Sequence, residues 1–339
     1  MSPEIAGEFT QTFHSLAAEL SASDLDRFLH ATSLIEVPAG RKLIKARMPV
    51  DSIYLVLSGR LDVFAESKEG AIKVSEIGPG EWVGEISVLS GDDRASATVS
   101  TATDVRLLRL RHQAFENLII GEGELPVLML QHLVLLMSAR LSKLVEMLSK
   151  LILDRSVVSR GSETEPAGID GRDRAAYWPE CRLADASASF RGFLHTLPGV
   201  ESFSAADLEM LYNAVELTLY PAGHVFTLQG QRGDSIFVVV DGAVSQRTHN
   251  PVANTVSEAV LNVGEWFALT SLAKELPEFS TASAIKPVFV ASLTRDSFNR
   301  LFDESSAIAR FVLYMLVKEL ARKVQSTLMS ILAVSVESR

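Results

Sequence analysis

The sequence contains almost no cysteine, since Cys181 is the only one among 339 residues. A single thiol excludes an intramolecular disulfide framework, and it excludes an iron–sulfur cluster ligated by several cysteines. The chain must therefore be stabilised by a hydrophobic core. This cysteine usage is typical of a reducing compartment, and we expect the protein in the cytoplasm.

Positive charge is scarce as well. The chain carries 32 lysine and arginine residues against 42 aspartates and glutamates, which gives a formal net charge of -10. Binding to nucleic acid or to an anionic membrane requires clustered lysine and arginine side chains. We therefore expect a protein partner and no nucleic acid.

Long apolar runs and a secretory signal are also absent. Residues 1–19 have neither the basic start nor the apolar centre of a signal peptide, and the apolar stretch 125–137 is interrupted by Gln131 and His132. A membrane span needs about 20 apolar residues. The apolar segments are expected to be amphipathic helices, with no membrane as a partner.

Signatures of catalysis and of metal binding are missing too. The 7 histidines are scattered, no residues have metal-ligand spacing, and no nucleophile motif is present. We expect a protein that is not an enzyme and that holds no metal.

What the chain does contain is an internal repeat. Its length predicts about two domains, and short motifs recur 183 residues apart. The recurring motifs are Pro38-Ala39-Gly40 with Pro221-Ala222-Gly223, Asp51-Ser52-Ile53 with Asp234-Ser235-Ile236, and Gly59 with Gly242. The Gly-Glu-Trp of 80–82 returns at 264–266, one residue further on. The chain is therefore expected to contain two domains of one kind.

Each copy shows short apolar segments separated by turns, such as 52–64, 72–77 and 105–110 in the first. Many short strands with closely spaced turns predict a sandwich or jelly roll. We expect an α+β, mainly β, fold: two tandem cupin-like β jelly rolls, each flanked by helices and followed by a long amphipathic helix. The predicted boundaries are a loose tail over 1–10, a first domain over 11–155, a linker over 156–189 that is rich in Ser, Gly, Asp and Arg, and a second domain over 190–339.

Both long helices carry an apolar seam whose members step by four and three, the pattern of a coiled coil. The first seam is Leu130, Val134, Met137, Leu141, Leu144, Leu148 and Leu151, and the second, 183 residues on, is Leu313, Val317, Leu320, Val324, Thr327, Ile331 and Val334. We expect the two seams to pair, either as an internal pseudo-dimer or in a homodimer. Packing of each helix on its own domain alone is the alternative.

The stretch 80–99, GEWVGEISVLSGDDRASATV, is the strongest candidate for a binding site. Gly84 lets the backbone approach a ligand closely, and Glu85 offers an acceptor for a hydroxyl group. Arg94, nine positions after Glu85, offers a forked and permanently charged donor for a phosphate. A surface ion pair between Glu85 and Arg94 is the competing interpretation.

This order of residues resembles the phosphate-binding cassette of cyclic nucleotide-binding domains, as in the catabolite activator protein and protein kinase A regulatory subunits. The resemblance implies that Glu85 binds the ribose 2′-hydroxyl and that Arg94 binds the cyclic phosphate. Ala95 resembles the cyclic AMP pattern, whereas kinases that bind cyclic GMP tend to carry Thr there, so cAMP is the expected ligand and cGMP the less favoured one. The remaining ligand-binding residues of the expected set are Gly84, Ile86, Ser87 and Ser96.

The second copy departs from this cassette. Gly84 falls on Ala268, Glu85 falls on Leu269, and Arg94 falls on Pro277 or Glu278. No arginine lies between Arg247 and Arg295 to replace the phosphate contact. We expect the second domain to keep its fold without binding a cyclic nucleotide.

These features predict a cyclic nucleotide sensor that binds its ligand in the first domain and signals through a protein partner. Activators of the family carry a helix-turn-helix domain after the long helix, and the sequence to Arg339 shows none. The resemblance also implies that a polar residue of a long helix caps the purine. The position of this cap aligns with Leu144 in the first long helix and with Thr327 in the second, and we expect Thr327 to reach the nucleotide. A hydrogen bond of Thr327 to its own helix is the alternative there. For the whole chain, the alternative is a scaffold or interaction protein with vestigial cassettes.

Overall fold

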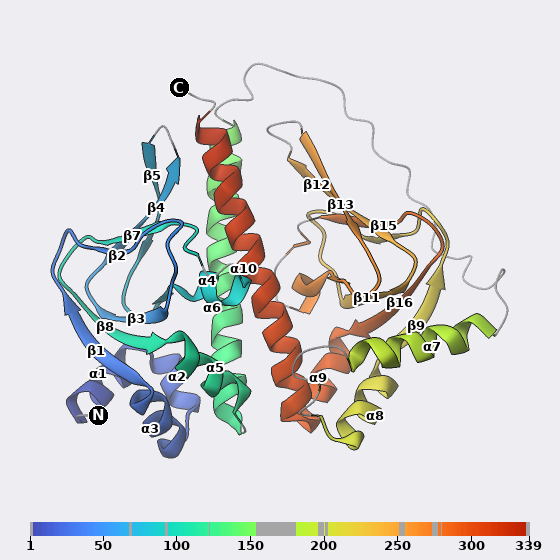
Figure 1. Ribbon diagram of the computed structural model, residues 1–339, viewed down its shortest axis with the longest axis horizontal. Coiled ribbons are helices and arrows are strands. Elements are labelled where there is room, and N and C mark those ends of the chain that lie inside the picture. Colours follow the sequence, from blue (N-terminus) through green and yellow to red (C-terminus); the bar gives the residue numbers. More distant parts are fainter. Residues whose placement is uncertain are drawn as a thin grey trace. The chain divides into compact units, whose positions relative to one another are not determined.

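The computed structural model contains two compact units, each described here by itself (Figure 1). The first comprises Met1–Leu151 with Leu313–Arg339, and the second comprises Ile152–Val312. The structure describes residues 3–67, 70–91, 94–121, 123–153, 181–195, 200, 203–250, 255–272, 277–278 and 280–336.

The first unit begins with three helices, α1 (Pro3–Thr12), α2 (His14–Glu19) and α3 (Ala22–His30). The prediction of a loose tail over 1–10 is therefore wrong. Phe9 is fully buried, and its ring stacks on Phe13 at 5.0 Å between centroids. Burial of a phenyl ring contributes about 1.5 to 3 kcal/mol, which favours an ordered N-terminal helix over a solvated tail.

Eight strands of the first unit form two antiparallel sheets on either side of its core (Figure 1). One sheet has the order β1-β8-β3-β6 and the other has the order β2-β7-β4-β5. The bounds are β1 (Thr32–Val37), β2 (Lys42–Ile44), β3 (Ser52–Ser58), β4 (Leu61–Ser67), β5 (Gly70–Ile77), β6 (Trp82–Val83), β7 (Thr98–Thr101) and β8 (Val105–Arg111).

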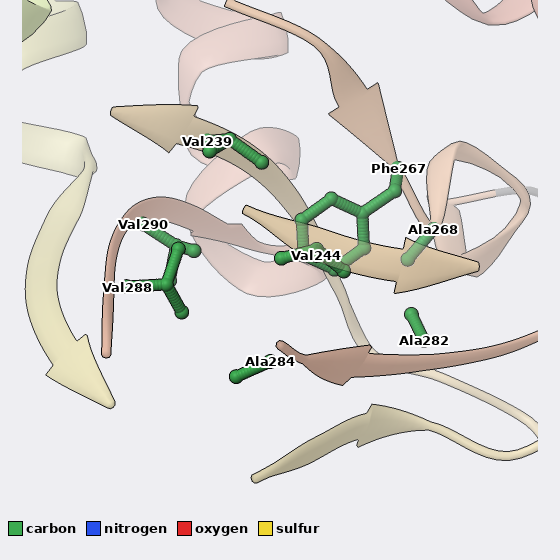
Figure 2. Close-up of a cluster of buried hydrophobic side chains, with 8 residues drawn as sticks. All are labelled: Val239, Val244, Phe267, Ala268, Ala282, Ala284, Val288 and Val290. Carbon is green, nitrogen blue, oxygen red and sulfur yellow. The ribbon is translucent and has the colours of Figure 1, made fainter. Parts of the chain in front are cut away.

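The second unit repeats this topology strand for strand, in the orders β9-β16-β11-β14 and β10-β15-β12-β13. Its strands are β9 (Glu216–Tyr220), β10 (Val225–Thr227), β11 (Ser235–Asp241), β12 (Val244–Asn250), β13 (Thr255–Leu261), β14 (Trp266–Phe267), β15 (Thr281–Ala284) and β16 (Val288–Thr294). Figure 2 shows valines of three of these strands packed around Phe267. The prediction of two tandem β sandwiches is confirmed.

Short helices flank the strands. The first unit has α4 (Glu85–Ser90) and α5 (His112–Ile120), and the second has α7 (Cys181–Leu194), α8 (Ala205–Ala214), the 3-10 turn η3 (Leu269–Leu272) and α9 (Arg295–Glu304). Helix α7 begins inside the predicted linker 156–189, so the linker is shorter at that end than predicted. The rest of that prediction, residues 156–180, lies outside the described residues.

Two long helices follow the sandwiches, α6 (Glu124–Leu153) and α10 (Ser306–Val336). From Leu313 onward α10 belongs to the first unit, so the second unit ends before the predicted residue 339. The seam residues that are buried are Leu130, Val134, Met137, Leu141, Leu144, Leu313, Val317, Leu320, Val324 and Ile331. Their burial agrees with the predicted seams, and pairing as a coiled coil stays a prediction.

Within the described residues, the segment Glu124–Val145 of α6 is long and apolar enough, by length and composition alone, to cross a membrane. The sequence had predicted no run of that kind, because charged and polar residues interrupt it. About half of the segment, 56%, is buried inside the protein. The core helix of a soluble domain has this same composition, so the segment is weak support for a membrane span.

Candidate functional site

A cavity in the first unit lies between helix α4, strands of the β2-β7-β4-β5 sheet and the two long helices. It encloses about 730 Å³ of space between atoms, part of which opens to solvent. Its lining is mostly apolar and is interrupted by polar groups at one side. The polar and charged lining residues are Ser75, Glu81, Glu85, Ser87, Ser96, Arg140 and Lys143.

Gly84 starts the backbone turn that positions this cassette. It has a φ of 92°, and an added Cβ would lie 2.7 Å from the carbonyl oxygen of Ser52. Only glycine adopts this conformation without strain and without displacing β3. The close approach that was predicted for the Gly84 backbone is therefore made to strand β3. Helix α4 begins at the next residue, Glu85.

Glu85 is the central polar group of the cavity and is fully buried. Its Oε1 accepts a hydrogen bond from Arg140 Nη1, whereas its Oε2 is buried without a partner among the described residues. Burial raises the pKa of Glu85 above its ordinary value against the opposing charge of Arg140. A buried acceptor with a free oxygen needs a donor, so a ligand hydroxyl in the cavity would satisfy it.

Arg140, on α6, was not predicted as a site residue. Its guanidinium donates to Glu85 and to the carbonyl oxygen of Trp82, and only 11% of the side chain is exposed. The signal in the sequence was a charged residue next to the seam position Leu141, inside an otherwise apolar helix. The ion pair connects the cassette to the first long helix.

Arg94 lies outside the lining of this cavity. Its side chain is exposed, and its Nη1 donates to the carbonyl oxygen of Arg47 at 3.0 Å. The next residue, Ala95, is buried and lines the cavity. Arg94 forms a β-bridge with Pro49, and the three residues that follow it, Ala95, Ser96 and Ala97, all line the cavity. Arg94 therefore lies directly before the lining segment of the loop.

Of the predicted ligand-binding residues, all but Arg94 and Thr327 line the cavity. The members that line the cavity are Gly84, Glu85, Ile86, Ser87, Ala95 and Ser96. Thr327 is not among the lining residues, and its Oγ1 donates to the carbonyl oxygen of Lys323 at 2.8 Å. The residues of the second long helix that do line the cavity are Val324 and Leu328.

The second cassette shares a pair of backbone hydrogen bonds with the first but differs from it in side-chain chemistry. The amide of Glu278 donates to the carbonyl of Gln231 at 2.8 Å, and its carbonyl accepts from Gly230 at 2.8 Å. In the first unit Ala95 makes the same pair of bonds, with Met48 and Arg47. Glu278 is therefore the counterpart of Ala95.

The side chain of Glu278 faces the second cassette, as that of Ala95 faces the first. It is 5% exposed, and its Oε1 accepts from the hydroxyl of Ser271 at 2.5 Å. Arg295 donates to the backbone carbonyls of Gly233 and Ser271. The carboxylate position of the first cassette is held here by Leu269, which is buried.

Among the described residues, no group of three or more His, Cys, Asp and Glu side chains could hold a metal ion. The polar groups around Glu85 form an ion pair and a single free acceptor, which suits a hydroxylated organic ligand better than a cation.

Comparison with known proteins gives a consistent family. The profile described as "Cyclic nucleotide-binding domain" matches residues 34–121 and 217–305, together more than half of the chain. A cAMP-dependent protein kinase regulatory subunit of Neurospora crassa is 23% identical over 93% of this chain and 66% of its own length. A cyclic nucleotide-gated potassium channel of Mesorhizobium japonicum is 32% identical over 35% of this chain and 33% of its own length.

Among solved structures, the regulatory domain of Toxoplasma gondii PKA with cAMP matches 92% of this chain and 96% of its own, at 16% identity and a TM-score of 0.33. The chain covers about a third of the length of the potassium channel and about two thirds of the length of the kinase regulatory subunit.

Proposed function

Because the chain belongs to the cyclic nucleotide-binding domain family and contains two such domains, we propose that it is a regulatory protein whose first domain binds cAMP in preference to cGMP. The observation that carries the proposal is the buried Glu85, whose Oε2 has no hydrogen-bond donor among the described residues and which lines a partly open cavity. A ribose 2′-hydroxyl supplies the missing donor. The apolar remainder of the lining suits a purine base.

In this proposal the nucleotide contacts the cassette from Gly84 to Ser87 and the segment from Ala95 to Ser96, all of which line the cavity. Leu144, Val324 and Leu328 offer apolar contacts from the long helices. Thr327 would have to give up its hydrogen bond to Lys323 to reach the base. The side chains of the long helices would then order around the ligand.

We propose that the second domain has lost the ligand. Leu269 provides no acceptor for a ribose hydroxyl, and the buried carboxylate of Glu278 bonds to Ser271 beside the cassette. A phosphate brought next to that carboxylate would add a second buried negative charge, which is unfavourable. The second domain then acts as a structural and regulatory partner of the first.

The output of the protein is proposed to be a contact with another protein in the cytoplasm, without nucleic acid and without catalysis. Relatives named as cAMP-dependent protein kinase regulatory subunits support a protein partner, and the acidic composition agrees with it. Pairing of the two apolar seams, within one chain or between two chains, is the proposed path from ligand to output.

One observation favours the alternative of a scaffold that binds no cyclic nucleotide: Arg94 is not among the residues that line the cavity, and its side chain donates to the Arg47 carbonyl. Calorimetric titration of the full chain with cAMP and with cGMP separates the two functions. The proposal predicts saturable binding that is tighter for cAMP. Absence of binding of both nucleotides at about 1 mM, an affinity weaker than about 4 kcal/mol, would establish the alternative.

A further inference from the structure

We propose that strand β13 of the second unit is the edge at which a protein partner docks, by adding an extended segment that carries a lysine or arginine between two apolar residues. The proposed function includes a protein partner. This inference rests on that part of it and names the surface and the chemistry of the contact. It follows from a comparison of two corresponding edge strands, β5 in the first unit and β13 in the second.

Strand β13 forms one edge of the β10-β15-β12-β13 sheet, where its only strand neighbour among the described residues is β12 (Figure 1). It has 7 residues, whereas β10 at the opposite edge of the sheet has 3. Alternate residues of an edge strand direct their N–H and C=O groups away from the sheet, where another strand can pair with them. The length of β13 is enough for several such hydrogen bonds.

The corresponding edge of the first unit is strand β5, which pairs with β4 as β13 pairs with β12. Two features protect β5 from further pairing. The register shifts between Val63 and Phe64 of β4, so β5 contains an extra residue there. Lys73 of β5 also forms ion pairs, with Asp62 at 2.6 Å and with Glu76 at 3.0 Å. Bulges and lysine side chains are the usual means by which proteins keep other strands away from an edge.

Strand β13 lacks both of these features. Its pairs with β12 run from Leu261 with Val244 to Thr255 with Asn250 without a register shift. Its sequence, Thr255–Leu261, contains neither lysine nor arginine. The edge is therefore regular over its whole length and carries no cation of its own.

The outer face of the two edges differs in the same sense. Asp62 of β4 pairs with Glu76, and Ser245, 183 residues after Asp62, pairs with Val260. Val260 therefore takes the place of Glu76. Glu76 is ion-paired with Lys73, whereas the Val260 side chain is 52% exposed. An ion-paired position of the first unit is thus an exposed aliphatic position in the second.

The exposed face of β13 has an alternating pattern. Val256, Glu258 and Val260 lie two residues apart and so share one face of the strand. Val256 is 60% exposed. Exposed aliphatic residues on an unprotected edge are typical of a site for strand addition, in which main-chain bonds give affinity and alternate side chains give specificity.

Glu258 decides which added strand fits. Its Oε1 accepts from the Ser245 hydroxyl at 2.5 Å and from Arg247 Nε at 3.1 Å, both on β12. These bonds lower the pKa of Glu258, so the group is a carboxylate at neutral pH. Its Oε2 takes part in neither bond. A lysine or arginine directly opposite Glu258 on the added strand would bind this oxygen, whereas an acidic residue there would be repelled.

A second copy of the chain fits this edge less well than a basic partner. Antiparallel self-pairing that places Val256 opposite Val260 of the other copy would also place the two Glu258 side chains opposite each other, which is unfavourable. Each copy also carries a net charge of -10, which opposes association of two copies. A segment with a cation opposite Glu258 and an apolar residue two positions to either side fits all three exposed residues.

The test uses a cyclic β-hairpin peptide as the probe, because cyclisation removes much of the cost of ordering a strand. One strand of the probe has the sequence Thr-Val-Thr-Lys-Thr-Val-Thr, and a matched peptide has Glu in place of Lys. In fluorescence polarisation, the full chain should bind the lysine peptide saturably below about 1 mM and the glutamate peptide about 3-fold to 10-fold more weakly. Hydrogen exchange should show protection of amides in β13 and not in β5.

Three variants of the full chain locate the contact. Val260→Glu with Glu258→Lys copies the residues of β5 and should weaken binding of the lysine peptide by about 10-fold or more. Val256→Thr with Val260→Thr keeps residues that favour strands and should weaken it by about 3-fold to 10-fold. The matched control Val225→Thr alters an exposed valine of β10, the opposite edge, and should change the affinity by less than about 2-fold.

Absence of binding of the lysine peptide at about 1 mM, or unchanged affinity in both β13 variants, would overturn the inference. Equal binding of the two peptides would overturn it as well, because the charge of Glu258 would then play no part. If the wild-type chain self-associates in sedimentation and Val256→Thr with Val260→Thr prevents this, a second copy covers the edge in place of a basic partner. Titration of the same proteins with cAMP tests the proposed nucleotide binding separately, since these substitutions lie outside its cavity.

Discussion

The two cassettes of this chain share a pair of backbone hydrogen bonds and differ in the side chains at two corresponding positions. In the first, Glu85 and Ala95 line a cavity, and Glu85 has a free acceptor among the described residues. In the second, the corresponding residues are Leu269 and Glu278, so the acceptor at the first position is lost and a buried carboxylate takes the place of Ala95. Corresponding positions of the two cassettes can therefore carry a free acceptor or an internally bonded group.

The cassettes also differ in what stabilises them. The first depends on Arg140 from a long helix, through an ion pair to a fully buried carboxylate. The second is stabilised by a local hydrogen bond from the Ser271 hydroxyl to Glu278 and by hydrogen bonds from Arg295 to two backbone carbonyls. A site that depends on a long helix can be coupled to that helix, whereas a site that is closed by local bonds is expected not to respond to a ligand.

The largest expected effect is on the ion pair between Glu85 and Arg140 in the first cassette. Arg140→Leu leaves the buried Glu85 without its partner and should destabilise the first unit by about 3 to 5 kcal/mol. Adding Glu85→Leu, the residue that the second cassette carries at this place, should recover most of the loss. Denaturant unfolding of the full chain, read at the transition of the first unit, measures both values. Equal stability of the double and single variants would contradict a coupled pair.

The second prediction concerns the turn at which each cassette begins. Gly84→Ala introduces a Cβ 2.7 Å from the Ser52 carbonyl at a φ of 92° and should cost about 1 to 3 kcal/mol. Ala268 already adopts a φ of 58°, so Ala268→Gly should stabilise the second unit by about 0.5 to 1 kcal/mol. The contrast is measured by thermal unfolding of the two variants. If Gly84→Ala instead stabilised the first unit, the strain expected for a side chain at residue 84 would be contradicted.

The smallest effect concerns pH. Burial raises the pKa of Glu85, with Glu81 adding to the shift and Arg140 opposing it. The native state therefore holds this proton more tightly than the unfolded chain, and the stability it contributes is lost as the pH rises through the native pKa. The stability of Glu85→Gln, which resembles the protonated group, should therefore improve relative to that of the wild type as the pH rises above the ordinary pKa of glutamate, about 4.3. A difference that does not vary with pH would contradict the raised pKa.

The repeat and the fold were accessible from the sequence, because strand patterns and turn glycines are local signals. Gly59 and Gly242, for example, both have positive φ and both close hairpins of the predicted strands. The loose tail was mispredicted because the burial of Phe9 depends on Phe13, which directly precedes α2, and on Phe28, which lies in α3.

The site was only partly accessible, for reasons of register and of distance along the chain. Spacing placed Arg94 nine residues after Glu85 but did not show that its guanidinium would bond to the Arg47 carbonyl and lie outside the cavity lining. Arg140 and Lys143 lie more than fifty residues after Glu85, so only the folded chain brings them to the cavity. The equivalence of Ala95 and Glu278 required the backbone hydrogen bonds of both units.

The central claim, that one cassette binds and the other is closed, is tested most directly by the stoichiometry of cAMP binding to the full chain. Calorimetric titration of the wild-type protein should give one site per chain. The variant with both Glu85→Leu and Arg140→Leu, which copies the second cassette and is expected to fold, should give none. Two sites in the wild type, or one remaining site in the double variant, would contradict the account.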